Sequence, residues 1–141
     1  MGFGTRLASG YRLTNISATN PPRIDIFVRG NPSLFIEVKW YSGTSVVSPA
    51  LFIKEFIERD LKSINSLDEL IWKIRGNKLT KEQVNAFLSS TEGRVALSNI
   101  DAAQANRLLG LSNLSNTNKP AIAQAFIDHF NVENNFNLIF K

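Results

Sequence analysis

Residues 23–41 decide the fold that this sequence predicts, and they read Arg23-Ile-Asp-Ile-Phe-Val-Arg-Gly-Asn-Pro-Ser-Leu-Phe-Ile-Glu-Val-Lys-Trp-Tyr41. Two runs, 23–29 and 34–41, alternate in the way that is typical of half-buried β-strands. The turn-forming residues Gly30, Asn31 and Pro32 separate them. An antiparallel hairpin is the simplest connection between two such strands. The sequence therefore predicts a hairpin over residues 23–41.

The length of the hairpin loop decides which residues share a face. Side chains alternate with period two, so Asp25 and Glu37 share a face only if the loop has an odd number of residues. A loop of Gly30 to Pro32 would set Asp25 opposite Glu37, with Lys39 on the same face. Like charges opposite each other destabilise a strand pair. A divalent cation bound by the carboxylate oxygens would remove that penalty.

This set of two acids and one amine resembles the signature of the PD-(D/E)XK nuclease superfamily. In that family an Asp on one strand is followed by Glu-x-Lys on the next strand of a hairpin. Pro22 and Asp25 match the first half, and Glu37-Val38-Lys39 match the second. The resemblance implies that Asp25, Glu37 and the main-chain carbonyl of Val38 bind the metal. It also implies that Lys39 orients the attacking water or stabilises the charge on phosphorus.

The resemblance covers about residues 20–41, and its motif is short. Many family members carry a further Glu on a helix before the first strand, whereas residues 1–24 of this chain contain no acid. That ligand is therefore absent, or a later acid replaces it. The resemblance implies a metal-dependent endonuclease that hydrolyses phosphodiester bonds of DNA or tRNA. The implied cofactor is Mg²⁺, with Mn²⁺ and Zn²⁺ as alternatives.

The small size of the chain and its missing N-terminal helix also resemble the toxin domains of bacterial polymorphic and contact-dependent growth inhibition systems. This resemblance implies a cognate immunity protein as a partner. It further implies that the domain is secreted or delivered as part of a larger protein and acts in the cytoplasm of a target cell.

Composition and charge agree with a globular protein that binds a polyanion. Hydrophobic residues make up 43% and charged residues 20% of the 141 residues, which excludes a disordered chain. There is no cysteine, so disulfides and thiolate metal sites are excluded. No apolar run approaches the roughly 20 residues of a membrane span. The net charge is +4, and residues 1–41 hold five basic residues against two acids, which favours a nucleic acid substrate.

Several basic and aromatic residues are candidates for contacting that substrate. Tyr41 would share the face of Lys39 and could stack on a base. Trp40 would share the opposite face with Ile36 and Val38, which favours a place in the core. Lys73 and Arg75 could hold phosphates of the substrate. They could equally well complement the dipole at the C-terminus of a predicted helix. The residues predicted to bind nucleic acid are Arg23, Arg29, Tyr41, Lys73, Arg75 and Lys78.

Two other interpretations use different residues. His129 is the single histidine and lies near the end of a predicted helix, where the helix dipole would favour its protonated form. A metal-independent RNase would instead use His129 and Glu37 as an acid–base pair. A non-catalytic module would bind nucleic acid through basic residues alone. Glu37 and Lys39 would then be a solvated charge pair on an exposed strand.

The predicted fold class is α/β, with a small mixed sheet built on the antiparallel hairpin and a helix-rich C-terminal half, as in a restriction-endonuclease-like fold. We expect a single domain over 1–141, strand-rich over 1–47 and mainly helical over 48–141. A further strand is expected at 11–17, and residues 137–140 suit a last short strand. Helices are predicted at 48–64, 66–76, 80–88, 101–109 and 118–130, from apolar spacing and capping residues.

Overall fold

The computed structural model describes the backbone of residues 11–17, 23–28 and 34–141, and side chains from residue 34 onward. The predicted turn, Gly30 to Pro32, lies outside these residues, as do Pro22 and Arg29. The chain divides into two compact units. The sheet unit comprises Met1–Val46, Asp68–Lys78 and Leu138–Lys141, and the helical unit comprises Val47–Leu67 and Leu79–Asn137. The single domain over 1–141 stays a prediction.

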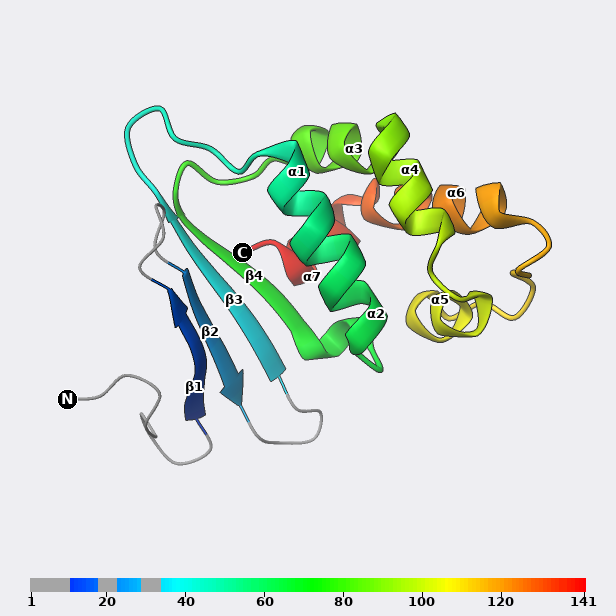
Figure 1. Cartoon of the computed structure of the whole chain (residues 1–141), viewed down its shortest axis with the longest axis horizontal. Coiled ribbons are helices and arrows are strands. Elements are labelled where there is room, and N and C mark those ends of the chain that lie inside the picture. The colour runs from blue at the N-terminus through cyan, green and yellow to red at the C-terminus, as the bar shows by residue number, and fades with distance from the viewer. Residues whose placement is uncertain (1–10, 18–22, 29–33) are drawn as a thin grey trace. The chain divides into compact units, whose positions relative to one another are not determined.

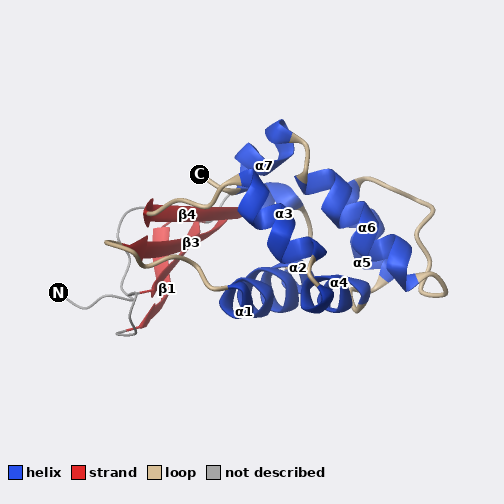
Figure 2. Ribbon diagram, turned by 90° about the horizontal axis from the view of Figure 1, so that it is seen from above, coloured by secondary structure: helices blue, strands red, loops and turns tan. Residues whose placement is uncertain are grey.

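Four strands form the sheet, with the order β1-β2-β3-β4 (Figure 1). Their bounds are β1 Tyr11–Ser17, β2 Arg23–Val28, β3 Leu34–Tyr41 and β4 Leu70–Gly76. β2 pairs antiparallel with β1 and β3, in a register that sets Asp25 opposite Glu37. β4 pairs parallel with β3, and Figure 2 shows these two strands side by side and pointing the same way.

The predicted fold class is wrong. It described a restriction-endonuclease-like sheet built on the antiparallel hairpin and followed by helices, with no strand at 70–76. The strands whose side chains are described, β3 and β4, form a parallel pair, and β4 occupies the region 66–76 where a helix was predicted. The apolar residues of this region fit both periods. Leu67, Leu70 and Ile74 fit a helix, but Leu70, Trp72 and Ile74 are the buried set, with the period of two of a strand.

The end of the chain also joins the sheet unit. The backbone N–H of Lys141 donates to the carbonyl of Trp72 at 2.9 Å, and the N–H of Ile74 donates to the carbonyl of Lys141 at 3.3 Å. Phe140 forms an isolated parallel bridge with Trp72, and their rings meet edge to face with centroids 6.2 Å apart. The segment 137–140, too short to classify from sequence, therefore has only this bridge at Phe140, because helix α7 (Glu133–Ile139) occupies the rest of it.

The helical unit is built from short helices with local caps. Its elements are α1 (Pro49–Phe52), the π-helix η1 (Ile53–Asp60), α2 (Leu61–Ser63), α3 (Lys81–Ser89), α4 (Thr91–Ser98), α5 (Ala102–Leu109) and α6 (Lys119–Phe130), with α7 extending into the sheet unit. The hydroxyl of Ser48 accepts from Leu51 N–H at 3.1 Å, and Thr80 forms a capping box with Gln83, which confirms both predicted helix starts. Stacked rings of Phe52 and Phe56, with centroids 4.9 Å apart, lie in its core.

β4 ends at Gly76, in a turn that brings the chain against β3. Gly76 has φ +85°, a conformation that side chains other than that of glycine rarely adopt. The next N–H, of Asn77, donates to the carbonyl of Tyr41 at 3.3 Å. The Asn77 side-chain amide donates to the carbonyls of Gly43 at 2.8 Å and Ser45 at 2.7 Å. These contacts fix the loop after β3 to the end of β4.

We expect Gly76→Ala to lower the free energy of unfolding by about 3 kcal/mol or more. A Cβ at this position would overlap the carbonyl oxygen of Tyr41, and the positive φ adds strain. Gly43→Ala is the matched control, because Gly43 has φ +62° and open space around it, so its cost is about 1 kcal/mol. Urea unfolding measures both, and equal losses would show that the approach to Tyr41 carries no weight.

Candidate functional site

The predicted site residues of β3 lie on the buried face of that strand. Glu37 is 0% exposed, and Lys39 and Tyr41 are 2% exposed. Trp40, on the opposite face, is 58% exposed. The prediction that Trp40 belongs to the core is therefore wrong, and so is the solvated charge pair of Glu37 and Lys39. Alternation along a strand separates two faces but does not say which of them is covered.

Glu37 and Lys39 form a buried ion pair. The Lys39 Nζ lies 3.1 Å from Glu37 Oε1 and 5.4 Å from the ring centroid of Trp72 on β4. Taking two such charges out of water costs several kcal/mol for each ion, and the attraction between them repays this cost only in part. Such a pair is therefore weak evidence for stability. Buried, interacting titratable groups are more frequent at functional sites, so this pair is the strongest candidate.

The register of β2 brings two further charged residues to the same face of the sheet. Asp25 is the partner of Glu37, and Arg23 is the partner of Lys39. Residues that lie directly opposite each other in an antiparallel pair share a face. The register therefore places Asp25 and Arg23 at positions that share a face with Glu37 and Lys39.

The donor set of this face suits a hard cation. Mg²⁺ binds through one or two carboxylates, its remaining positions being filled by water and by substrate phosphates. Glu37 supplies one carboxylate, and Asp25 holds the register position for a second. Among the residues whose side chains are described, no group of three or more histidines or acids could hold a metal ion. The acids present would thus fit a cation that is completed by substrate, rather than an all-protein cage.

The predicted nucleic-acid contacts separate into different places. Tyr41 is 2% exposed, as Lys39 is, and its stacking on a base stays a prediction. Lys73 is partly buried and Arg75 exposed on β4, so neither complements a helix C-terminus. Lys78 is exposed two residues after β4 ends. The backbone register places Arg23 beside Lys39, and Arg29 lies outside the described residues.

His129 lies in the last turn of α6 and is partly buried. The side-chain amide of Asn135 donates to the His129 carbonyl at 3.0 Å and lies 3.5 Å from Nδ1. Burial lowers the pKa of His129, because desolvation disfavours the charged ring. Desolvation therefore opposes the protonated form that the helix dipole was predicted to favour. His129 belongs to the helical unit, and Glu37 to the sheet unit.

Sequence patterns missed a buried polar cluster in the helical unit. Glu55 and Asp60 are both buried in η1. Arg59 Nε donates to Asp60 Oδ1 at 2.7 Å, and Arg59 NH1 lies 3.9 Å from Glu55 Oε2. The buried amide of Gln104 donates to the Leu61 carbonyl at 2.9 Å.

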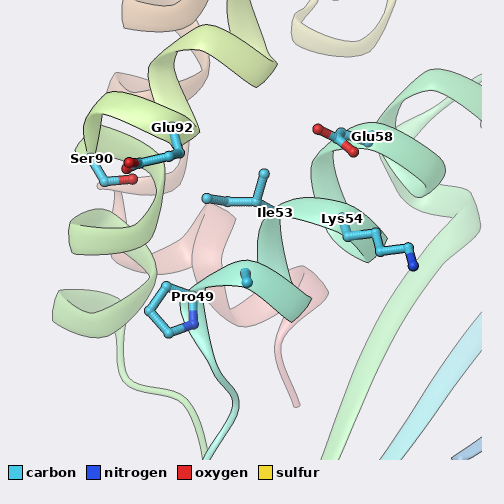
Figure 3. A pocket seen from close by; sticks show the side chains of 7 residues that line it. Pro49, Ile53, Lys54, Glu58, Ser90 and Glu92 are labelled. Carbon is cyan, nitrogen blue, oxygen red and sulfur yellow. The ribbon is translucent and has the colours of Figure 1, made fainter.

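A pocket of about 720 Å³ lies in the helical unit along η1 and the start of α4. Figure 3 shows Ile53 between Ser90 and Glu92 on one side and Lys54 and Glu58 on the other. Pro49 and Ala50 complete the lining. None of the residues predicted to act in catalysis or metal binding lines this pocket, so it adds nothing to the candidate site.

Comparison of the chain with protein-family models, with curated proteins and with solved structures finds no match. In the part of the chain that the structure describes, no helix has both the length and the apolar character needed to cross a membrane.

Proposed function

We propose that this chain is a metal-dependent endonuclease that hydrolyses phosphodiester bonds of nucleic acid. The observation that carries the proposal is the buried Glu37–Lys39 pair, with 3.1 Å between Oε1 and Nζ, on the face that also holds Asp25 by register. Two acids opposite each other repel, and Lys39 offsets part of this repulsion at Glu37, so a bound cation would add to an attraction already present. A lysine beside them supplies positive charge where a phosphate would bind. The net charge of +4 favours a polyanionic substrate.

Each residue has a separate task in this proposal. Asp25 and Glu37 hold the cation, together with the main-chain carbonyl of Val38. A bound divalent cation supplies an activated water and neutralises charge on the phosphate. The ammonium group of Lys39 would donate a hydrogen bond to the phosphate oxygen on which negative charge grows during attack. Mg²⁺ suits these hard oxygen ligands, and Mn²⁺ or Zn²⁺ are alternatives.

The test is cleavage of plasmid DNA, genomic DNA and total tRNA by the purified chain with Mg²⁺, Mn²⁺, Zn²⁺ or a chelator. We expect cleavage of at least one substrate with a divalent cation, and none with the chelator. Cleavage that persists in the chelator would contradict metal dependence. Absence of cleavage under every condition, with retained binding, would instead favour a non-catalytic module.

A metal-independent RNase is the second candidate, and one observation favours it. Burial lowers the pKa of His129 by desolvation, which favours the neutral ring that a general base needs. The variant His129→Gln separates the two candidates. It should leave cleavage unchanged if Asp25 and Glu37 hold a metal, and should abolish chelator-resistant cleavage of RNA if His129 is the base.

The toxin role, the immunity protein and the target-cell cytoplasm follow from the sequence resemblance alone and stay predictions. The structural observations that support the proposal concern the chemistry of β2 and β3.

A further inference from the structure

The face of the sheet opposite Glu37 carries an exposed aromatic side chain among basic residues. We call it the Trp40 face, and its described residues are Ile36, Val38 and Trp40 of β3 with Ile71, Lys73 and Arg75 of β4. The parallel register sets Trp40 beside Arg75 and Val38 beside Lys73. A tryptophan is usually buried over most of its surface, whereas Trp40 is 58% exposed. Its ring is therefore available to a ligand.

The charge of the Trp40 face has one sign. Lys73 and Arg75 make no ion pair with any residue of the described chain, and the six described residues of the face include no acid. Lys78, just beyond the end of β4, is exposed as well. Basic side chains without acidic partners beside an exposed ring fit a ligand that combines phosphates with flat bases.

We propose that the Trp40 face binds a single-stranded segment of nucleic acid, with one base stacked on Trp40 and phosphates held by Lys73 and Arg75. A ring on a sheet face can stack on an unpaired base, whereas the bases of a duplex are already stacked on each other. The segment lies on the face opposite Glu37 and Lys39, so it is a part of the substrate that is not being cut. The role of the Trp40 face as a surface that holds substrate rests on the proposed function. A measurement of nucleic-acid binding, without cleavage, is enough to test it.

The test uses the fluorescence of Trp40 in the presence of a chelator, which prevents metal-dependent cleavage. The chain has two tryptophans, and the other, Trp72, is fully buried, so a ligand at the surface changes the signal of Trp40. A single-stranded oligonucleotide of about 12 residues spans a site of this kind. We expect it to quench Trp40. Trp40→Ala should weaken binding about tenfold, measured by anisotropy of a labelled oligonucleotide.

Matched variants separate stacking from charge. Trp40→Phe should keep most of the affinity but lose the fluorescence change. Arg75→Ala and Lys73→Ala should each lower the slope of log affinity against log salt by about 0.7. Val95→Ala and Lys62→Ala are controls, because Val95 is 57% exposed and Lys62 is exposed, both in the helical unit. Neither control should change affinity.

The inference is overturned if Trp40→Ala binds as tightly as wild type, if a duplex of the same sequence binds equally well, or if polyglutamate quenches Trp40 equally. These results differ from failure of the proposed function. Quenching and binding without any metal-dependent cleavage would leave the Trp40 face in place and remove the nuclease. Metal-dependent cleavage with no loss of nucleic-acid binding in Trp40→Ala would keep the nuclease and remove the Trp40 face.

Discussion

The double variant Glu37→Gln/Lys39→Met is expected to be folded and to have no metal-dependent cleavage. Each single variant leaves the other member of the pair charged, buried and without its partner at 3.1 Å. Breaking a buried pair in this way costs about 3–5 kcal/mol of unfolding free energy, whereas replacing both members by uncharged groups of similar shape is often neutral. Stability should therefore return in the double variant. Cleavage should not, because the carboxylate that would hold the cation is gone.

The measurement is a four-protein cycle of wild type, the two single variants and the double variant. Urea unfolding gives the stability of each, and cleavage with Mg²⁺ gives activity at a temperature where each is folded. If the pair serves only the fold, cleavage will return with stability in the double variant. That result would remove Glu37 and Lys39 from the site. The cycle is needed because Glu37 is 0% exposed, so loss of activity in a single variant could reflect unfolding.

Asp25→Asn tests the second acid, which lies opposite Glu37 in the strand register. We expect loss of cleavage with close to wild-type stability, because Asp25 is placed as a cation ligand by its register with Glu37. Glu82→Gln, an exposed acid in the first turn of α3, is the control and should keep full activity. Wild-type cleavage by Asp25→Asn would contradict its role as a ligand.

Local hydrogen bonding made the helix starts and stops predictable from sequence. The Ser48 cap, the Thr80–Gln83 box and the stop at Gly110, with φ +67°, each involve residues a few positions apart. The free energy that selects them is local, so the sequence near each one suffices. The helix boundaries that depend on them at 101 and 109 agree with the structure to within one residue.

Tertiary contacts decide the element type at 70–76 and the buried face of β3, neither of which the sequence pattern could determine. The segment at 70–76 fits a helix by apolar spacing, but its parallel pairing with β3, 35 residues earlier at Phe35 and Leu70, makes it a strand. In the same way, alternation on β3 could not say that the face of Glu37 is buried and the face of Trp40 exposed. Glu55 and Asp60 of η1 are buried as well, which their charge alone does not predict.

The description of the candidate site depends on a sequence motif and on the burial of its residues in the structure. The identities of Asp25, Glu37 and Lys39 came from a short motif in the sequence. Their environment came from the structure, which buries the Glu37–Lys39 pair beside Trp72 and buries Tyr41 as well. Burial changes the expected behaviour of the variants, because removing a half-exposed acid would cost little stability, whereas breaking a buried pair costs about 3–5 kcal/mol.

Lys39→Ala is expected to lower the rate of cleavage by the bound enzyme roughly 10²–10³-fold while nucleic acid affinity stays close to wild type. The amine lies 3.1 Å from Glu37 Oε1, on the face proposed to hold the cation. An amine there meets the negative charge that grows as water attacks phosphorus, so it stabilises the transition state more than the ground state. Its loss should appear in kcat and leave KM almost unchanged.

Two further measurements separate this role from a structural one. A small alkylamine added to Lys39→Ala should restore part of the rate, because it replaces the missing ammonium in the space that the side chain leaves. Lys39→Arg should not restore it, because the broader guanidinium does not fit a site that is 2% exposed and shares its face with Trp72. Single-turnover cleavage beside a binding titration gives rate and affinity for each variant whose fold is intact by circular dichroism. If Lys39→Ala loses affinity at an unchanged bound-state rate, Lys39 anchors a phosphate and takes no part in the chemical step.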